Sequence, residues 1–193
     1  MRNPTYYHGS AGPFDRPDPS RFKEIGSYGP GYYLTSDRQL AKSYSIEKIA
    51  EKLGVKPSKV KAAPYIRMVD MPDDFHLFDI GENISASDLE GLFSALHITQ
   101  EEREREDYRY GRAALKPGVW ANAVYDTLVE ILKRRGEERP KVKIAAALDH
   151  MGYQGVTSSG GFIVMVFLSE MHKLRNVETG EYEANPARRR GAR

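Results

Sequence analysis

The chain has 193 residues, of which 40% are hydrophobic, and this composition predicts one globular domain with a single core. It has no cysteine, which excludes disulfides, thiolate zinc sites and cysteine nucleophiles. No run approaches the roughly 18 apolar residues that a membrane helix needs, and the first ten residues do not resemble a secretion signal. We therefore expect a cytoplasmic protein without a membrane partner.

Positive charge is concentrated at the end of the chain. The formal net charge is +2, and residues 181–193 contain four Arg and two Glu, so the preceding 180 residues carry equal numbers of basic and acidic side chains. A neutral body disfavours nucleic-acid binding, which needs a basic face. We expect a folded domain over residues 1–175 and a disordered basic tail over 176–193, with contact to an acidic partner as the alternative for the tail.

The first third of the chain is predicted to form two strands and one helix. The strands are expected at 5–8 and 32–35, separated by a long loop rich in Gly, Pro, Asp and Ser. Ser36 is predicted to cap a helix that ends at Gly54. The apolar stripe of this helix would consist of Leu40, Ala41, Tyr44, Ile46, Ile49, Ala50 and Leu53.

The rest of the chain is predicted to mix strands and helices. Strands are expected at 64–71, 75–79, 155–157 and 162–167, and helices at 87–96, 101–115, 122–135 and 142–150. The helix at 101–115 is very polar, so we expect it to be a solvated surface helix. The segment FIVMVF at 162–167 is apolar throughout, which predicts a central strand with both faces covered.

Three motifs point to a ligand site: YYHGS at 6–10, GPGYYLTSDRQLAKSY at 29–44 and GYQGVTSSGGFIVMVFLSE at 152–170. Tyr33 and Tyr44 are eleven residues apart, and two aromatic faces hold a planar ring well. A glycine backbone can approach a ligand amide closely, and a histidine can bond a sugar hydroxyl. These groups suit a nicotinamide riboside.

At these residues the sequence resembles the ADP-ribosyltransferases of the His-Tyr-Glu type, which include diphtheria toxin and the poly(ADP-ribose) polymerases. The order of HGS, FDRPDPS, GPGYYLTSD, PYIRMVDMPDD, GYQGV and a hydrophobic last strand is similar to that of the ADP-ribosyltransferase domains in large polyvalent phage proteins. The resemblance covers roughly residues 5–175. It implies an α+β fold in which two small antiparallel sheets pack at an angle, with flanking helices and NAD in the cleft between them.

The resemblance also implies NAD as the substrate and gives roles to residues. His8 would contact the adenine-side ribose, and the Gly9 backbone would pair with the nicotinamide carboxamide. Tyr33 and Tyr44 would sandwich the nicotinamide ring, and Ser10 could assist. Tyr32 and Tyr33 alternate across a strand, so only one can face a cleft, and the motif spacing selects Tyr33.

Two further contacts follow from the resemblance. The loop at 11–30 would cover the dinucleotide, with Arg16 or Arg21 as candidates for the pyrophosphate, because guanidinium pairs well with phosphate oxygens. The small-residue loop at 157–161 lies where the family contacts its acceptor. The remaining histidines have no metal-ligand spacing, so we predict no metal site.

The sequence departs from the family pattern at two positions. Ala41 stands where the polymerases have a serine that bonds the carboxamide. Ile163 stands at the position of the catalytic glutamate, and an apolar side chain cannot hold a ribose hydroxyl or stabilise an oxocarbenium charge. Glu170 is a poor substitute, because we expect it past the end of the strand. These departures disfavour chain extension and leave single transfer or no catalysis.

We therefore expect a mono-ADP-ribosyltransferase that modifies a host protein in the bacterial cytoplasm, as a phage or bacterial effector. The first alternative, favoured by Ile163, is a catalytically inactive NAD fold that serves as a binding or inhibitory module. The second is a helix-turn-helix DNA-binding protein, based on residues 46–62 with Lys56, Lys59 and Lys61 toward phosphates. Pro64 would cut that recognition helix short.

Overall fold

The computed structural model describes residues 5–12, 26–105, 112–158 and 160–180. The chain divides into two compact units. Unit 1 consists of Met1–Pro17, Tyr33–Asp73 and Lys173–Arg193, and unit 2 consists of Asp18–Tyr32 and Asp74–His172. Among the described residues, no helix has the length and apolar composition needed to cross a bilayer.

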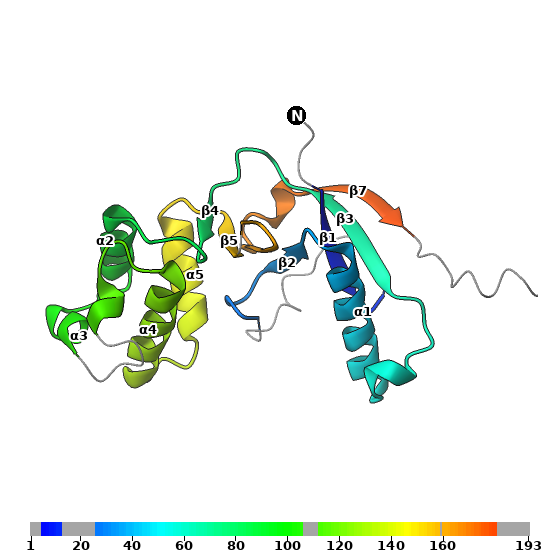
Figure 1. The fold of residues 1–193 in the computed structure, drawn as a ribbon, viewed down its shortest axis with the longest axis horizontal. Coiled ribbons are helices and arrows are strands. Elements are labelled where there is room, and N and C mark those ends of the chain that lie inside the picture. The colour runs from blue at the N-terminus through cyan, green and yellow to red at the C-terminus, as the bar shows by residue number, and fades with distance from the viewer. Residues whose placement is uncertain (1–4, 13–25, 106–111, 159, 181–193) are drawn as a thin grey trace, which may run out of the picture. The chain divides into compact units, whose positions relative to one another are not determined.

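Unit 1 is built around strands β1 (Thr5–Ser10) and β3 (Tyr65–Asp70), which pair antiparallel over six residues. On its other edge β1 pairs antiparallel with β2 (Tyr32–Thr35). The second edge of β3 pairs with β7 (Arg175–Gly180), as Figure 1 shows. Regular structure thus continues five residues beyond the expected end of the folded domain, and residues 181–193 lie outside the described residues.

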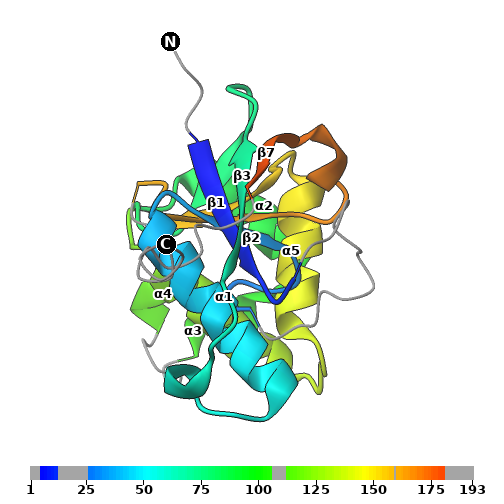
Figure 2. The same cartoon turned by 90° about the vertical axis from the view of Figure 1, so that its right-hand side faces the viewer.

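Helix α1 (Arg38–Leu53) packs along β1 and β3 (Figure 2). It ends at Gly54, which adopts the left-handed conformation with φ 65° that favours glycine, as predicted. Its buried residues include Ala41, Ile49 and Ala50. The predicted stripe is wrong at Tyr44, which is 43% exposed, and at its end, where Leu53 is 60% exposed. The face that packs on the strands is narrow and made largely of small residues.

The residue that caps α1 differs from the prediction. The helix begins at Arg38, so Asp37 takes the capping position and Ser36 lies one residue too early. The Asp37 carboxylate accepts hydrogen bonds from the amides of Gln39, at 2.7 Å, and Leu40, at 3.3 Å. Asp37 is itself oriented by its own amide, which donates to the Thr35 hydroxyl.

The segment after α1 does not form the second helix of a helix-turn-helix motif. It contains only η2 (Pro57–Lys59), a single turn of 3-10 helix without buried residues. The chain then enters β3 at Tyr65. Lys56, Lys59 and Lys61 are exposed but do not lie on a recognition helix.

Unit 2 joins four α-helices to three strands in its described part. The helices are α2 (Ala86–Ala95), α3 (Gln100–Glu104), α4 (Ala121–Arg134) and α5 (Pro140–His150), and the strands are β4 (Leu77–Asp79), β5 (Gly155–Ser158) and β6 (Ile163–Val166). Short 3-10 turns occur at η3 (Arg112–Leu115) and η4 (Met171–Lys173). α4 and α5 lie side by side in Figure 1, and α5 also contacts α2 and β5. Apolar residues such as Val124, Leu128, Ile144 and Leu148 are fully buried and form the core.

The strands confirm an α+β protein but do not support two antiparallel sheets. β5 pairs antiparallel with β6, whereas β4 pairs with β5 in parallel, which makes the strand arrangement mixed. A parallel pair needs a long crossover, and here helices α2 to α5 supply it. In β6, Val164, Met165 and Val166 are fully buried, so both faces are covered here as predicted, but Phe162 precedes the strand and is 42% exposed.

The helix predicted at 101–115 is wrong as one continuous element. α3 ends after Glu104, and Arg105 adopts extended φ and ψ angles of −65° and 137°. No residue of α3 is buried, so tertiary packing does not stabilise a longer helix, and intrinsic helix propensity alone is too weak to do so.

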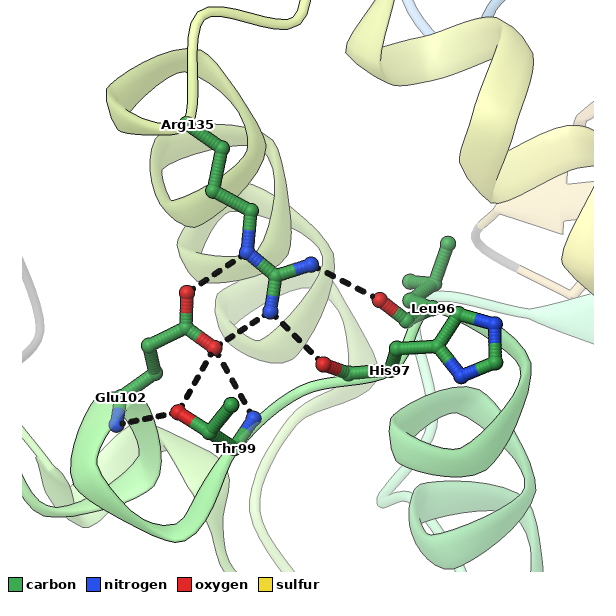
Figure 3. Close-up of polar contacts among 5 residues, drawn as sticks. All are labelled: Leu96, His97, Thr99, Glu102 and Arg135. Atoms are coloured by element: carbon green, nitrogen blue, oxygen red, sulfur yellow. Dashed lines mark hydrogen bonds and ion pairs between the residues drawn. The ribbon is translucent and has the colours of Figure 1, made fainter.

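A cluster around Arg135 fixes α3 to the end of α4 (Figure 3). The Arg135 guanidinium donates to both carboxylate oxygens of Glu102 and to the carbonyls of Leu96 and His97. Thr99 and Glu102 cap α3 reciprocally, because each side chain bonds the backbone amide of the other residue. These contacts lower the pKa of Glu102 to about 2, chiefly through the hydrogen bonds from Arg135.

The cap predicts a difference between two neighbouring substitutions. Asp37→Ala should lower the free energy of unfolding by about 1 kcal/mol, because two helix amides lose their acceptor. Ser36→Ala should change it by less than about 0.5 kcal/mol. Urea denaturation measures both, and a larger effect at Ser36 would contradict the assignment of the cap.

The Glu102 cluster predicts a stability that depends on acid pH. The folded-state pKa lies below the ordinary value, so the carboxylate stabilises the fold above about pH 4.5 and this contribution is lost as the pH falls toward 2. Glu102→Gln should cost about 1–2 kcal/mol at pH 7 and flatten the dependence between pH 4.5 and 2. Denaturation at several pH values tests this.

Glu51→Gln is the matched control for Glu102→Gln. Glu51 pairs with Lys48, but the two side chains are 72% and 61% exposed. Loss of such an exposed pair should cost less than about 0.5 kcal/mol. Equal acid profiles for Glu102→Gln and the unmodified protein would contradict a stabilising role of the cluster.

Candidate functional site

His8 lies on β1 and is held by the backbone of β2. Its Nδ1 is 2.8 Å from the carbonyl oxygen of Tyr33. A carbonyl oxygen only accepts, so Nδ1 carries the proton and donates it. Burial lowers the pKa of His8 to about 4, the hydrogen bond to Tyr33 opposes this, and the positive charge of Arg67 adds to the lowering. His8 is therefore a neutral imidazole at neutral pH.

The strand pairing changes beside His8. β1 pairs with β3 at all six of its residues, but its pairing with β2 consists of Tyr7 opposite Thr35. Two residues before Thr35, the carbonyl of Tyr33 bonds the His8 ring. The His8 side chain on β1 thus bonds a backbone carbonyl of β2. This contact is next to Gly9, where the sequence predicts the contact with the carboxamide.

Gly9 has a packing role of its own. A Cβ built on this residue would collide with the carbonyl oxygen of Ala41 and lie 2.8 Å from the amide nitrogen of Ser45. Both of those atoms belong to the backbone of α1, which cannot move aside without losing its contact with β1. The sequence explained Gly9 by the approach of a ligand, whereas the structure shows that the approach of α1 already requires a glycine here.

Ser45 joins α1 to the ends of both central strands. Its hydroxyl donates to the carbonyl of Ser10 at 2.7 Å and accepts from the amide of Tyr65 at 2.6 Å. The residue is completely buried. The Ser10 hydroxyl donates to the carbonyl of Gly12, so it stabilises the turn after β1. Sequence analysis missed Ser45, although the small residues Ala41 and Ser45 are one helical turn apart and indicate close helix packing.

The two tyrosines of the predicted sandwich both belong to unit 1. Tyr33 is half-buried on β2, while its neighbour Tyr32 is almost completely buried. Tyr44 lies on α1, directly before Ser45, and is 43% exposed. The difference between Tyr32 and Tyr33 agrees with the alternation that selected Tyr33. The ring sandwich itself stays a prediction.

Arg67 is a candidate that sequence analysis missed. It lies opposite His8 in the register of β1 and β3, and it is 1% exposed. A fully buried arginine is rare in proteins. The motif PYIRMVDMPDD contains Arg67, but its burial is apparent only once both faces of β3 are seen to be covered.

Other predicted residues do not join this group. Arg16 and Arg21 lie outside the described residues. Ile163 is half-buried at the start of β6, opposite Ser158, and Glu170 comes after the end of that strand, as expected. Pockets in the described part of the chain lie elsewhere and include one of about 340 Å³ in unit 2, beside Phe93 and Arg103, and one of about 200 Å³ in unit 1, beside Asp70 and Arg175.

The packing at Gly9 predicts a large effect of one added methyl group. Gly9→Ala should destabilise the protein by about 2–3 kcal/mol, because the methyl meets the backbone of α1. Gly12→Ala is the matched control, because a Cβ there has no atom within 4 Å. Thermal denaturation compares the two, and equal melting temperatures would contradict the close packing.

Comparisons with protein-family models, with curated proteins and with solved structures found no match. Function is therefore argued from the residues of this chain. The residues placed near one another are His8, Gly9 and Ser10 on β1, with Tyr33 bonded to His8 and Arg67 opposite it.

Proposed function

We propose that this protein is a mono-ADP-ribosyltransferase that moves ADP-ribose from NAD to a protein acceptor and releases nicotinamide. We further propose that it is a phage or bacterial effector and that the acceptor is a protein of the bacterial cytoplasm. The observation that carries the proposal is the neutral His8, held by the Tyr33 carbonyl at the end of β1 and followed directly by Gly9.

This arrangement supports binding of a dinucleotide. A neutral imidazole with its proton on Nδ1 has a lone pair on Nε2, which accepts a hydrogen bond from a ribose hydroxyl. The nicotinamide ring would lie between Tyr33 and Tyr44, and the backbone of Gly9 or Ser10 would meet its carboxamide. Each ring stack contributes on the order of 0.5–1.5 kcal/mol beyond buried area.

The proposed reaction is a displacement at the anomeric carbon of the nicotinamide ribose. The bond from this carbon to the pyridine nitrogen breaks, and its electron pair neutralises the pyridinium, so that nicotinamide leaves. A nucleophilic oxygen or nitrogen of the acceptor forms the new bond and loses its proton. The protein contributes chiefly by holding the two reactants in line and by excluding water.

Ile163 limits what the enzyme can do. The side chain cannot bond a ribose hydroxyl, so it cannot activate a second ADP-ribose unit for chain extension. Single transfer, with the acceptor supplying its own activating group, is the reaction that these residues support.

Ile163 also favours a second candidate, an NAD fold that binds without catalysis. The two candidates differ in one measurement, the release of nicotinamide from NAD in the presence of a bacterial lysate. The transferase produces nicotinamide together with labelled protein, whereas the binding module produces neither while still binding NAD in calorimetry.

We expect His8→Ala and Tyr33→Ala each to reduce labelling by tagged NAD about tenfold or more, since each removes a ligand contact. Tyr33→Phe should retain labelling because it keeps the ring. The measurement is transfer of tagged ADP-ribose to proteins of a bacterial lysate, with melting temperatures to verify folding.

His172→Ala is the matched control for His8→Ala. His172 also bonds a backbone carbonyl through Nδ1, that of Ser169 at 2.8 Å, but it is exposed and belongs to unit 2. Its removal should leave labelling unchanged. If His8→Ala labels as well as His172→Ala does, the role of His8 is wrong.

A further inference from the structure

Arg67 and His8 share one face of the central strand pair. Residues directly opposite each other in antiparallel strands have Cβ atoms about 4.5–5.5 Å apart and point to the same side. His8 stands opposite Arg67 in this register, and α1 packs against Gly9 on the other side of β1. The guanidinium is fully buried, so water screens its charge poorly.

The neighbours of His8 on this face define its electrostatic environment. The alternation of β1 and β3 places Tyr6 and Tyr65 on the same side, and neither carries a formal charge at neutral pH. Arg67 is therefore the charged group on this face of these two strands. From β2 the carbonyl of Tyr33 approaches Nδ1.

We propose that Arg67 is a positioning residue that keeps His8 neutral, with its proton on Nδ1, so that Nε2 acts only as a hydrogen-bond acceptor. An imidazolium at this place would lose its hydration and face a buried cation, and both effects oppose protonation. The Tyr33 carbonyl then fixes which nitrogen holds the single proton. A ligand group that meets Nε2 must consequently be a donor, such as a hydroxyl.

The part of the inference that concerns the ligand rests on the proposed function, whereas the state of His8 does not. If NAD binds here, the ribose hydroxyl donates to Nε2, and the affinity does not change as long as His8 stays neutral. Arg67 thereby extends NAD binding to mildly acidic pH.

The state of His8 is tested in the ligand-free protein by nitrogen-15 NMR of the imidazole rings. In the unmodified protein we expect the Nδ1–H tautomer and no protonation of His8 above pH 5. Arg67→Met and Arg67→Gln should raise the midpoint of His8 protonation by about one pH unit, and Arg67→Lys should keep it low. An Nε2–H tautomer, or an unchanged midpoint in a folded neutral variant, overturns the proposal.

Arg175→Gln is the matched control, because Arg175 also belongs to the strands of unit 1 but is exposed and stands opposite Asp70. It should leave the midpoint of His8 unchanged. The tautomer of the unmodified protein tests the Tyr33 contact separately, since an Nε2–H form contradicts the proposal without any substitution.

The ligand part is tested by calorimetry with NAD and with an analogue that has deoxyadenosine in place of adenosine. The analogue should bind about tenfold more weakly, as expected for one lost hydrogen bond. Affinity for NAD should be nearly constant between pH 5 and 8 in the unmodified protein, and in Arg67→Met it should fall to about half by pH 5. Absence of NAD binding at every pH, together with a raised His8 midpoint in the neutral Arg67 variants, contradicts the proposed function and leaves the role of Arg67 confirmed.

Discussion

The close approach of α1 to β1 is the constraint on which unit 1 depends. Gly9 has no side chain, so the backbone of α1 can lie against the strand, and the small residues Ala41 and Ser45 form the helix side of this contact. Ser45 then satisfies a carbonyl at the end of β1 and an amide at the start of β3, two backbone groups that the helix would otherwise cover without a partner. The buried Ser45 hydroxyl thus allows α1 to pack tightly on the strands while the backbone groups at the ends of β1 and β3 keep hydrogen-bond partners.

The same geometry determines the chemistry on the opposite face. With α1 on the side of Gly9, the side chains of His8 and Arg67 extend from the other side of the strand pair, where burial acts on both. A half-buried imidazole opposite a fully buried guanidinium does not act as an acid at neutral pH, so His8 is suited to recognition and not to general acid catalysis. This assignment agrees with a role at a sugar hydroxyl, away from the reacting bond.

The sequence predicted the elements with strong local signals. The strand at 32–35, the end of α1 at Gly54 and the buried strand β6 depend on apolar patterns and on a glycine with positive φ. The prediction failed where the position or end of an element depends on one adjacent residue or on a partner far away in the chain. Examples are the cap at Asp37, the early end of α3 and the pairing of β7 with β3. The motif singled out His8 and Gly9, whose ligand contacts stay predictions, and the analysis missed Ser45 and Arg67, because their burial depends on elements far away in the chain.

Ile163 and Arg67 both bear on whether the proposed site can activate NAD or only bind it. Under the proposed function, the apolar Ile163 at the start of β6 leaves activation of the attacking group to the acceptor, so the acceptor would control the rate as well as the specificity. His8 does not replace the missing acid, because its pKa of about 4 and its bond to the Tyr33 carbonyl leave it neutral and acceptor-only at Nε2. If NAD binds at His8 as proposed, the described residues of unit 1 are suited to holding the dinucleotide and not to activating it, and turnover would depend on the protein that receives the ADP-ribose.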